Sequence, residues 1–175
     1  MDIFSALNKE EIEKLQLAPA LVTILVGASD GKLDGEERTW SENLLRARGY
    51  AGNQALQEFY RVVSEGFWVE LQHQMSILPS DTTARNSLLI DQLKELNPVL
   101  AKLSPVVAYN LYKGLLGLAE EVAKASGGFL RIGAISESEH DLLNLSMLTP
   151  IEAPAVLVTD QQDLDAHLED EQSEE

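Results

Sequence analysis

Cysteine is absent from this chain of 175 residues. Its absence excludes disulfide bonds, catalysis by a thiolate, and zinc or iron–sulfur sites that use cysteine ligands. The chain also lacks a phosphate-binding glycine loop, a dinucleotide-binding fingerprint and an H-E-x-x-H helix. A signal peptide begins with a basic segment followed by an apolar one, and the first residues of this sequence do not show that pattern. We therefore expect a cytoplasmic protein, in keeping with a chain that has no thiols.

Basic residues are scarce, since 13 Lys and Arg stand against 29 Asp and Glu, for a net charge of −16. Nine of the acids lie in residues 151–175, a segment that contains no Lys or Arg. An acidic field repels phosphate backbones, which argues against nucleic acid as a direct partner. Cations and basic protein surfaces are the partners that this charge favours.

Long apolar runs are missing as well. The longest nearly apolar stretch, residues 17–28, is too short to cross a bilayer and contains Pro19 and Thr23. With 45% hydrophobic and 24% charged residues, the composition is that of a globular protein. We expect a soluble protein with one domain in residues 1–150 and a flexible acidic tail in residues 151–175.

Apolar residues recur with helical spacing, and strand-like alternation is scarce. The pattern predicts an all-α fold of seven to eight helices. The first is expected over residues 8–15 with Asn8 as its cap, and the second over residues 17–28 with Pro19 near its start. A third is expected over about residues 35–48, and a fourth from Asn53, with Gly66 as a candidate break.

Four further helix starts are expected along the chain. Ser80 or Asp81 is predicted to cap a helix that buries leucines, and Asn97-Pro98 and Ser104-Pro105 are predicted to restart the helix by a cap and a proline. A last helix is expected from Ser136 to before Thr149. The long helix after Ser104 has one apolar stripe, formed by Val107, Leu111, Leu115, Leu118 and Val122.

An acidic stretch over residues 29–37 lies between two expected helices. This stretch matches the second half of an EF-hand calcium loop. Positions five, six, eight, nine and twelve of that loop would be Asp30, Gly31, Leu33, Asp34 and Glu37. Positions one and three would be Val26 and Ala28, which have no side-chain oxygen. Because Ca²⁺ takes six to eight oxygen ligands, this half-loop alone cannot complete a site.

A weaker copy of this stretch occurs about a hundred residues later. Residues 28–31 resemble residues 125–128, and residues 32–37 resemble residues 134–139, with five residues inserted between the two pieces of the second copy. Both copies follow an apolar helix and precede an amphipathic one. This repeat predicts two related helix–turn–helix units whose turns could face each other. Asp30, Asp34 and Glu37 could then share a pocket with Ser136 and Glu139.

These motifs resemble those of the TerB-like family of tellurite-resistance and stress-response proteins. The resemblance covers roughly residues 10–148 and is carried by residues 28–37 and, in the second copy, by residues 135–139. It implies an all-helical fold of two pseudo-repeated units whose acidic residues bind a divalent metal. The resulting hypothesis is a non-enzymatic stress-response module that acts through protein partners.

In this hypothesis a hard cation is held by carboxylates from Asp30, Asp34, Glu37 and Glu139. Oxygen ligands favour Ca²⁺ or Mg²⁺ over zinc. Capping is an alternative role for three of these acids, because Asp34 with Glu37, and Ser136 with Glu139, fit the capping-box spacing. Asp30 differs from them, since it follows a helix whose dipole disfavours an anion at its end. Asp30 is therefore the strongest candidate ligand.

Two other functions stay open. The first is a metal-free interaction module that uses the acidic face and the tail to dock a basic partner. The second is a serine hydrolase, because residues 27–31 satisfy G-x-S-x-G with Ser29 as the nucleophile, and His73, His140 and His167 follow it in the chain. The expected helices around Ser29 argue against the strand-to-helix turn that such a nucleophile requires.

Overall fold

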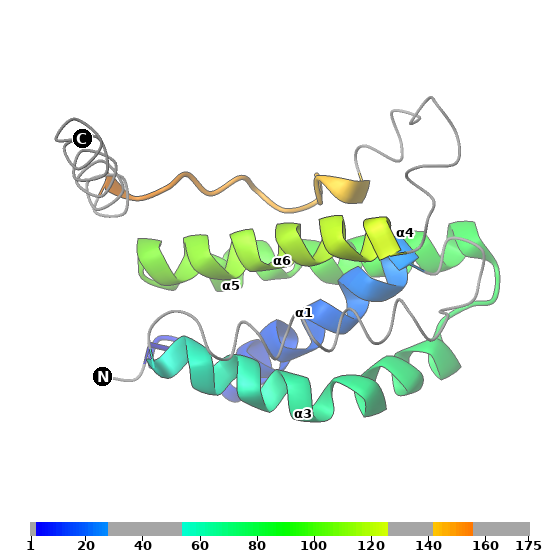
Figure 1. The fold of residues 1–175 in the computed structure, drawn as a ribbon, viewed down its shortest axis with the longest axis horizontal. Coiled ribbons are helices and arrows are strands. Elements are labelled where there is room, and N and C mark those ends of the chain that lie inside the picture. Colours follow the sequence, from blue (N-terminus) through cyan, green and yellow to red (C-terminus); the bar gives the residue numbers. More distant parts are fainter. Residues whose placement is uncertain (1–2, 28–53, 126–141, 156–175) are drawn as a thin grey trace, which may run out of the picture.

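The computed structural model describes residues 3–27, 54–125 and 142–155 of the chain. All regular secondary structure in these three ranges is helical, as predicted, and they contain no strand (Figure 1). The expected third helix over residues 35–48 lies outside the described residues. So do the beginning of the last expected helix and most of the acidic tail.

Helix α1 (Lys9–Gly27) lies at the centre of the fold and contacts α3, α4, α5 and α6. Every residue from Ala18 to Leu25 is buried, so this half of the helix is covered on all sides. A helix that is apolar all round needs such an environment. Figure 1 shows α1, in blue, between α3 on one side and the other helices on the opposite side.

The prediction of two separate helices around Pro19 is wrong, because α1 runs through the proline without interruption. A proline inside a helix has no N–H to donate to the carbonyl four residues earlier. The hydroxyl of Thr23, which is fully buried, donates a hydrogen bond to the Pro19 carbonyl oxygen at 2.8 Å. Burial against the surrounding helices keeps the chain helical despite the missing bond.

The predicted cap at Asn8 is confirmed as one half of a reciprocal capping box. The Glu11 backbone N–H donates to Asn8 Oδ1 at 2.9 Å, and the Asn8 N–H donates to Glu11 Oε2 at 3.0 Å. The other carboxylate oxygen of Glu11 accepts a hydrogen bond from Lys102 Nζ. One carboxylate therefore caps α1 and also ties it to the turn between α5 and α6.

This double role of Glu11 predicts a pH-dependent stability. The hydrogen bond from Lys102, followed by that from the Asn8 backbone, lowers the pKa of the Glu11 carboxyl below its ordinary value. Its stabilisation is therefore present above the unfolded-state pKa and is lost as the pH falls through the folded-state pKa. We expect Glu11→Gln to lower the free energy of unfolding near neutral pH, with the difference from wild type vanishing in acid. Urea titrations across this pH range, with Glu13→Gln as control, measure it, and a difference that does not change with pH contradicts it.

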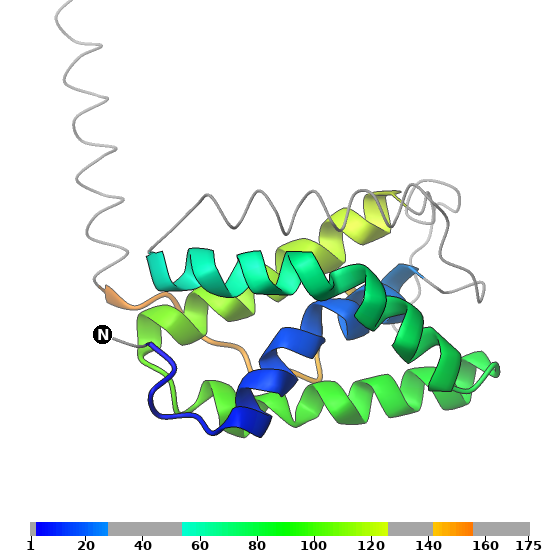
Figure 2. The same ribbon diagram turned by 90° about the horizontal axis from the view of Figure 1, so that it is seen from below.

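Helix α3 (Gln54–Ile77) packs along α1 and buries the face predicted for it, through Leu56, Phe59, Tyr60, Val63 and Phe67. The prediction of a helix break at Gly66 is wrong, since α3 continues through this glycine to Ile77. Figure 2 shows that α3 bends along its course but remains one helix. The packing of Phe67 and Leu71, both buried, holds the helix together across the glycine.

Helix α4 (Thr82–Lys94) begins at the predicted cap, because Asp81 Oδ1 accepts a hydrogen bond from the Ala84 N–H at 2.8 Å. Its Leu89 and Leu93 are fully buried, as expected. The short α5 (Leu96–Leu100) follows directly. A helix does restart near Asn97-Pro98, as predicted, but it begins at Leu96, and Glu95 rather than Asn97 is the cap residue.

Helix α6 (Pro105–Ala125) begins at Pro105, as the sequence predicts. All five residues of its predicted stripe are buried, and the helix packs against α1. After the gap in the described chain, residues 142–155 run over the layer that contains α4, α5 and α6 (Figure 1), and they are bonded to Asn97 of α5. The helix predicted up to Thr149 ends at Leu143. The backbone angle φ of Leu145 is 46°, which a right-handed helix cannot contain.

The segment of residues 142–155 is held by apolar and polar contacts. Leu145, Met147 and Leu148 are buried in the core. Asn97 Nδ2 donates to the Met147 carbonyl oxygen at 3.0 Å, and Asn97 Oδ1 accepts from the Thr149 N–H at 2.7 Å. The side chain of Asn97 thus satisfies two backbone groups of a segment about fifty residues away, which explains why it does not act as a helix cap.

Candidate functional site

The four predicted metal ligands, Asp30, Asp34, Glu37 and Glu139, lie outside the described residues. The same holds for Ser29, the nucleophile of the hydrolase alternative. The structure does place the helix ends from which these segments begin. Helix α1 ends at Gly27, three positions before Asp30, and α6 ends at Ala125, two positions before the first glycine of the second copy.

The C-terminal ends of α1 and α6 lie at the same end of the molecule. Both helices run in the same general direction, and their last turns are neighbours in Figures 1 and 2. Unpaired carbonyl groups give each helix C-terminus a partial negative charge. The last turn of α1 contains no basic residue, whereas that of α6 contains Lys124, which pairs with Glu120 and Glu121 at 2.9 and 2.8 Å. The described side chains of the last turn of α1 thus supply no positive charge to balance its end.

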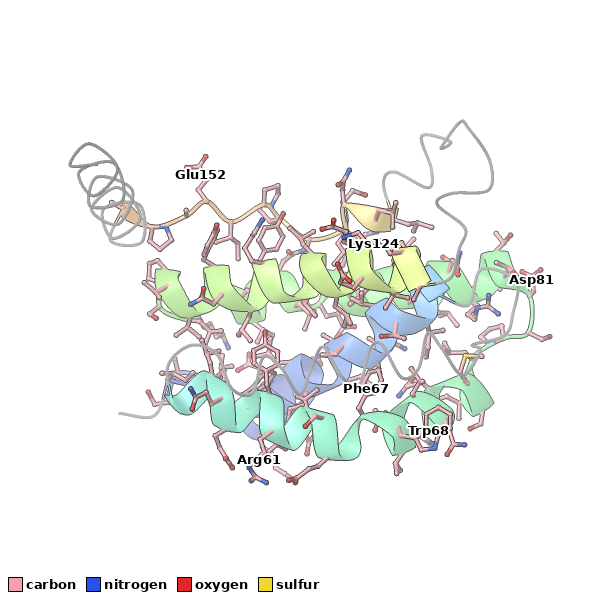
Figure 3. The ribbon with its side chains drawn as sticks, in the orientation of Figure 1. Arg61, Phe67, Trp68, Asp81, Lys124 and Glu152 are labelled. Atoms are coloured by element: carbon pink, nitrogen blue, oxygen red, sulfur yellow. The ribbon has the colours of Figure 1, made fainter. Side chains whose placement is uncertain are left out.

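Within the described part of the chain, no group of three or more His, Asp or Glu side chains is arranged to hold a metal ion. His73, one of the three histidines that follow Ser29 in the chain, is exposed on α3. Many of the described acids instead form ion pairs along single helices or between neighbouring ones. Arg61, for example, binds Glu58 and Glu65 at 2.6 Å on the outer side of α3, and it points away from the core in Figure 3.

A groove between α1 and α3 is a further surface feature with functional potential. Its volume is about 540 Å³. Its floor is apolar, formed by Leu17 and Ala20 of α1 and by Val63 and Phe67 of α3. Phe67 lies between the two helices in Figure 3. Its polar rim is formed by Glu10, Glu13, Lys14, Gln16 and Glu70.

The single basic residue of this rim is already paired. Lys14 Nζ lies 2.8 Å from a carboxylate oxygen of Glu95 and 3.3 Å from one of Glu10. These hydrogen bonds, the one to Glu95 first, raise the pKa of Lys14 above its ordinary value. Glu70 accepts a hydrogen bond from the side-chain amide of Gln74 at 2.8 Å. Because an amide is neutral, this bond does not balance the negative charge of Glu70. The rim is therefore acidic.

The helical periodicity of α3 predicts its buried face but not this groove. Val62, Val69 and Ile77, spaced seven and eight residues apart, fall on one flank of the same helix. They are 39%, 70% and 60% exposed. An apolar stripe beside the core face of an amphipathic helix is the signal that could have indicated a second contact surface.

Comparison with known proteins gave no match among family models, curated proteins or solved structures. The likeness of the acidic stretch to the TerB-like family stays a prediction. None of the described helices combines the length and the hydropathy that a bilayer crossing requires.

Proposed function

We propose that this protein is a non-enzymatic, cytoplasmic stress-response module similar to the TerB-like family. In this proposal it binds Ca²⁺ or Mg²⁺ through Asp30, Asp34 and Glu37, joined by Glu139, and acts through protein partners. The two acidic stretches belong to two related helix–turn–helix units in a domain of seven to eight helices. The observation that supports it best is that the helices preceding the two stretches, α1 and α6, end side by side.

The helix ends give a physical reason for a cation at this place. Two neighbouring helix C-termini place partial negative charge at one end of the domain, and the segment after α1 adds Asp30, Asp34, Glu36 and Glu37 against Lys32. A hard cation compensates that charge and takes the oxygen ligands that the half-loop supplies. Because α1 is the central buried helix, a cation bound directly after it would also secure the core element to which the other helices attach.

This coupling makes metal binding visible as stability. A ligand that binds only the folded state stabilises it by about 2.7 kcal/mol at a concentration a hundredfold above Kd. We expect Ca²⁺ or Mg²⁺ to give heat in a calorimetric titration and to raise the melting temperature, and Asp30→Asn to reduce both effects. Asp81→Asn is the matched control, because asparagine caps a helix as well as aspartate does. Absence of heat and of any melting shift at millimolar metal contradicts the metal site.

The metal-free interaction module is the second candidate, favoured by the acidic rim between α1 and α3 and by the net charge of −16. In that case binding of a basic partner survives a chelator and weakens with added salt. A serine hydrolase remains the third, and labelling of Ser29 by an activity-based serine probe is the result that would favour it.

A further inference from the structure

The groove between α1 and α3 has the form of a docking site for a helix. Its lining extends from Glu10 to Ala20 on α1, about 15 Å at a rise of 1.5 Å per residue, which corresponds to roughly three helical turns. Recognition of an amphipathic helix uses such an apolar groove between helices, into which side chains spaced three, four and seven residues apart insert.

Gly66 leaves room in the wall of this groove. A Cβ atom added at Gly66 would meet no heavy atom within 4 Å, although the residue lies in the middle of α3. The exposed side chain of Val62 lies one turn before it and lines the same groove, and Val69 extends the apolar surface along α3. A glycine inside a helix makes the helix less stable than an alanine would, so Gly66 leaves this space at the expense of helix stability.

The charge around the groove selects the kind of partner. Three carboxylates, from Glu10, Glu13 and Glu70, line the groove beside its apolar floor. The ammonium of Lys14 is engaged by Glu10 and Glu95, and the highly exposed Lys9 pairs with Glu13 at 3.3 Å along the solvent side of α1. A second copy of the chain would bring a net charge of −16 against the same charge. Lys and Arg side chains flanking an apolar stripe would instead complement the rim.

We propose that this groove binds a basic amphipathic helix of a partner protein. Apolar residues of that helix occupy the floor over Leu17 and Phe67, and its Lys or Arg residues pair with Glu13 and Glu70. This inference gives the chemistry of the partner in the proposed function. It rests on that function only for the existence of a protein partner, since the groove lies on described helices and needs no cation.

A synthetic peptide tests the proposal on the full chain. The probe is a fluorescent amphipathic helix with leucines at i, i+3, i+4 and i+7 and with lysine and arginine on both flanks of that stripe. Binding is followed by anisotropy in the presence of a chelator and again with Ca²⁺. We expect binding under both conditions, and much weaker binding of the same peptide with glutamates in place of its basic residues.

Gly66→Leu is the decisive variant, because it fills the groove while favouring the helix. It should weaken peptide binding at least about tenfold, which corresponds to 1.4 kcal/mol. Gln72→Leu adds the same side chain at an exposed position of α3 outside the groove lining, and should bind as wild type does. Circular dichroism verifies that both variants keep their helix content. Equal binding by the two variants overturns the proposal.

A second pair of variants separates the groove from general attraction by an acidic protein. The double variant Glu13→Gln and Glu70→Gln should weaken binding several-fold, whereas Glu58→Gln with Glu65→Gln changes the net charge equally on the outer side of α3 and should have little effect. Equal losses from the two double variants overturn the proposal. So does self-association of the wild type that Gly66→Leu abolishes, since the occupant would then be a second copy. Peptide binding, together with no heat and no melting shift when Ca²⁺ or Mg²⁺ is added to the protein, supports the groove and refutes the cation site.

Discussion

Replacing Ile24 with alanine should lower the free energy of unfolding by about 2–5 kcal/mol. Ile24 is fully buried in the half of α1 that is covered on all sides, so its truncation leaves a cavity between several helices. Such a cavity collapses poorly when its walls belong to different elements that pack against one another. Denaturation with urea measures the change as a shift in the midpoint at unchanged slope.

Ile77→Ala provides the matched control for this truncation. Ile77 is 60% exposed at the C-terminal end of α3, and the same atoms are removed from it. Substitutions at such surface positions usually change stability by less than about 0.5 kcal/mol. Similar losses from the two variants would show that α1 is not the centre of the core.

Asn97→Ala should cost about 1–3 kcal/mol of stability, because two backbone groups lose their partner at once. The Met147 carbonyl and the Thr149 N–H are both bonded to the Asn97 side chain. We expect residues 142–155 to become the first site of cleavage in limited proteolysis, while α1, α3 and α6 keep their protection. Hydrogen exchange at Thr149 should rise in parallel.

The control for this variant is Asn144→Ala, which removes an exposed asparagine from the same segment. It should leave both the unfolding midpoint and the proteolytic pattern unchanged. Asn97→Asp is informative as well, because it keeps the acceptor for the Thr149 N–H and loses the donor to the Met147 carbonyl oxygen. A wild-type cleavage pattern in Asn97→Ala would contradict the role assigned to this residue.

Local patterns predicted local structure well. The caps at Asn8 and Asp81, the start of α6 at Pro105 and the buried stripe of that helix follow from side chains within a few residues of one another. Capping and helical periodicity are interactions between sequence neighbours, which is why a single sequence reveals them.

The errors occurred where tertiary packing outweighed local preference. Pro19 and Gly66 would end or break an isolated helix, yet each lies within a helix that buries a wide apolar surface. Asn97 before a proline has the form of a helix cap, but its partners lie about fifty residues further along the chain. No pattern over a short window contains that information.

Of the two candidate sites, one was predicted from local sequence patterns and the other depends on tertiary packing. The cation site was predicted from motifs and from resemblance, and its ligands Asp30, Asp34, Glu37 and Glu139 lie outside the described residues. The groove exists only because α1 and α3 meet, so its lining is scattered over two segments about fifty residues apart. A sequence shows the two helices separately, and the contact surface emerges only when they pack together.

The central position of α1 has a consequence for synthesis of the chain. This helix leaves the ribosome before the helices that cover it, which extend to Ala125. Its apolar residues therefore stay without their native neighbours until most of the chain has emerged, at a synthesis rate of about 5–20 residues per second. During that interval residues 18–25 lack the helices that bury them, so we expect the domain to complete its folding only after α6 has been made.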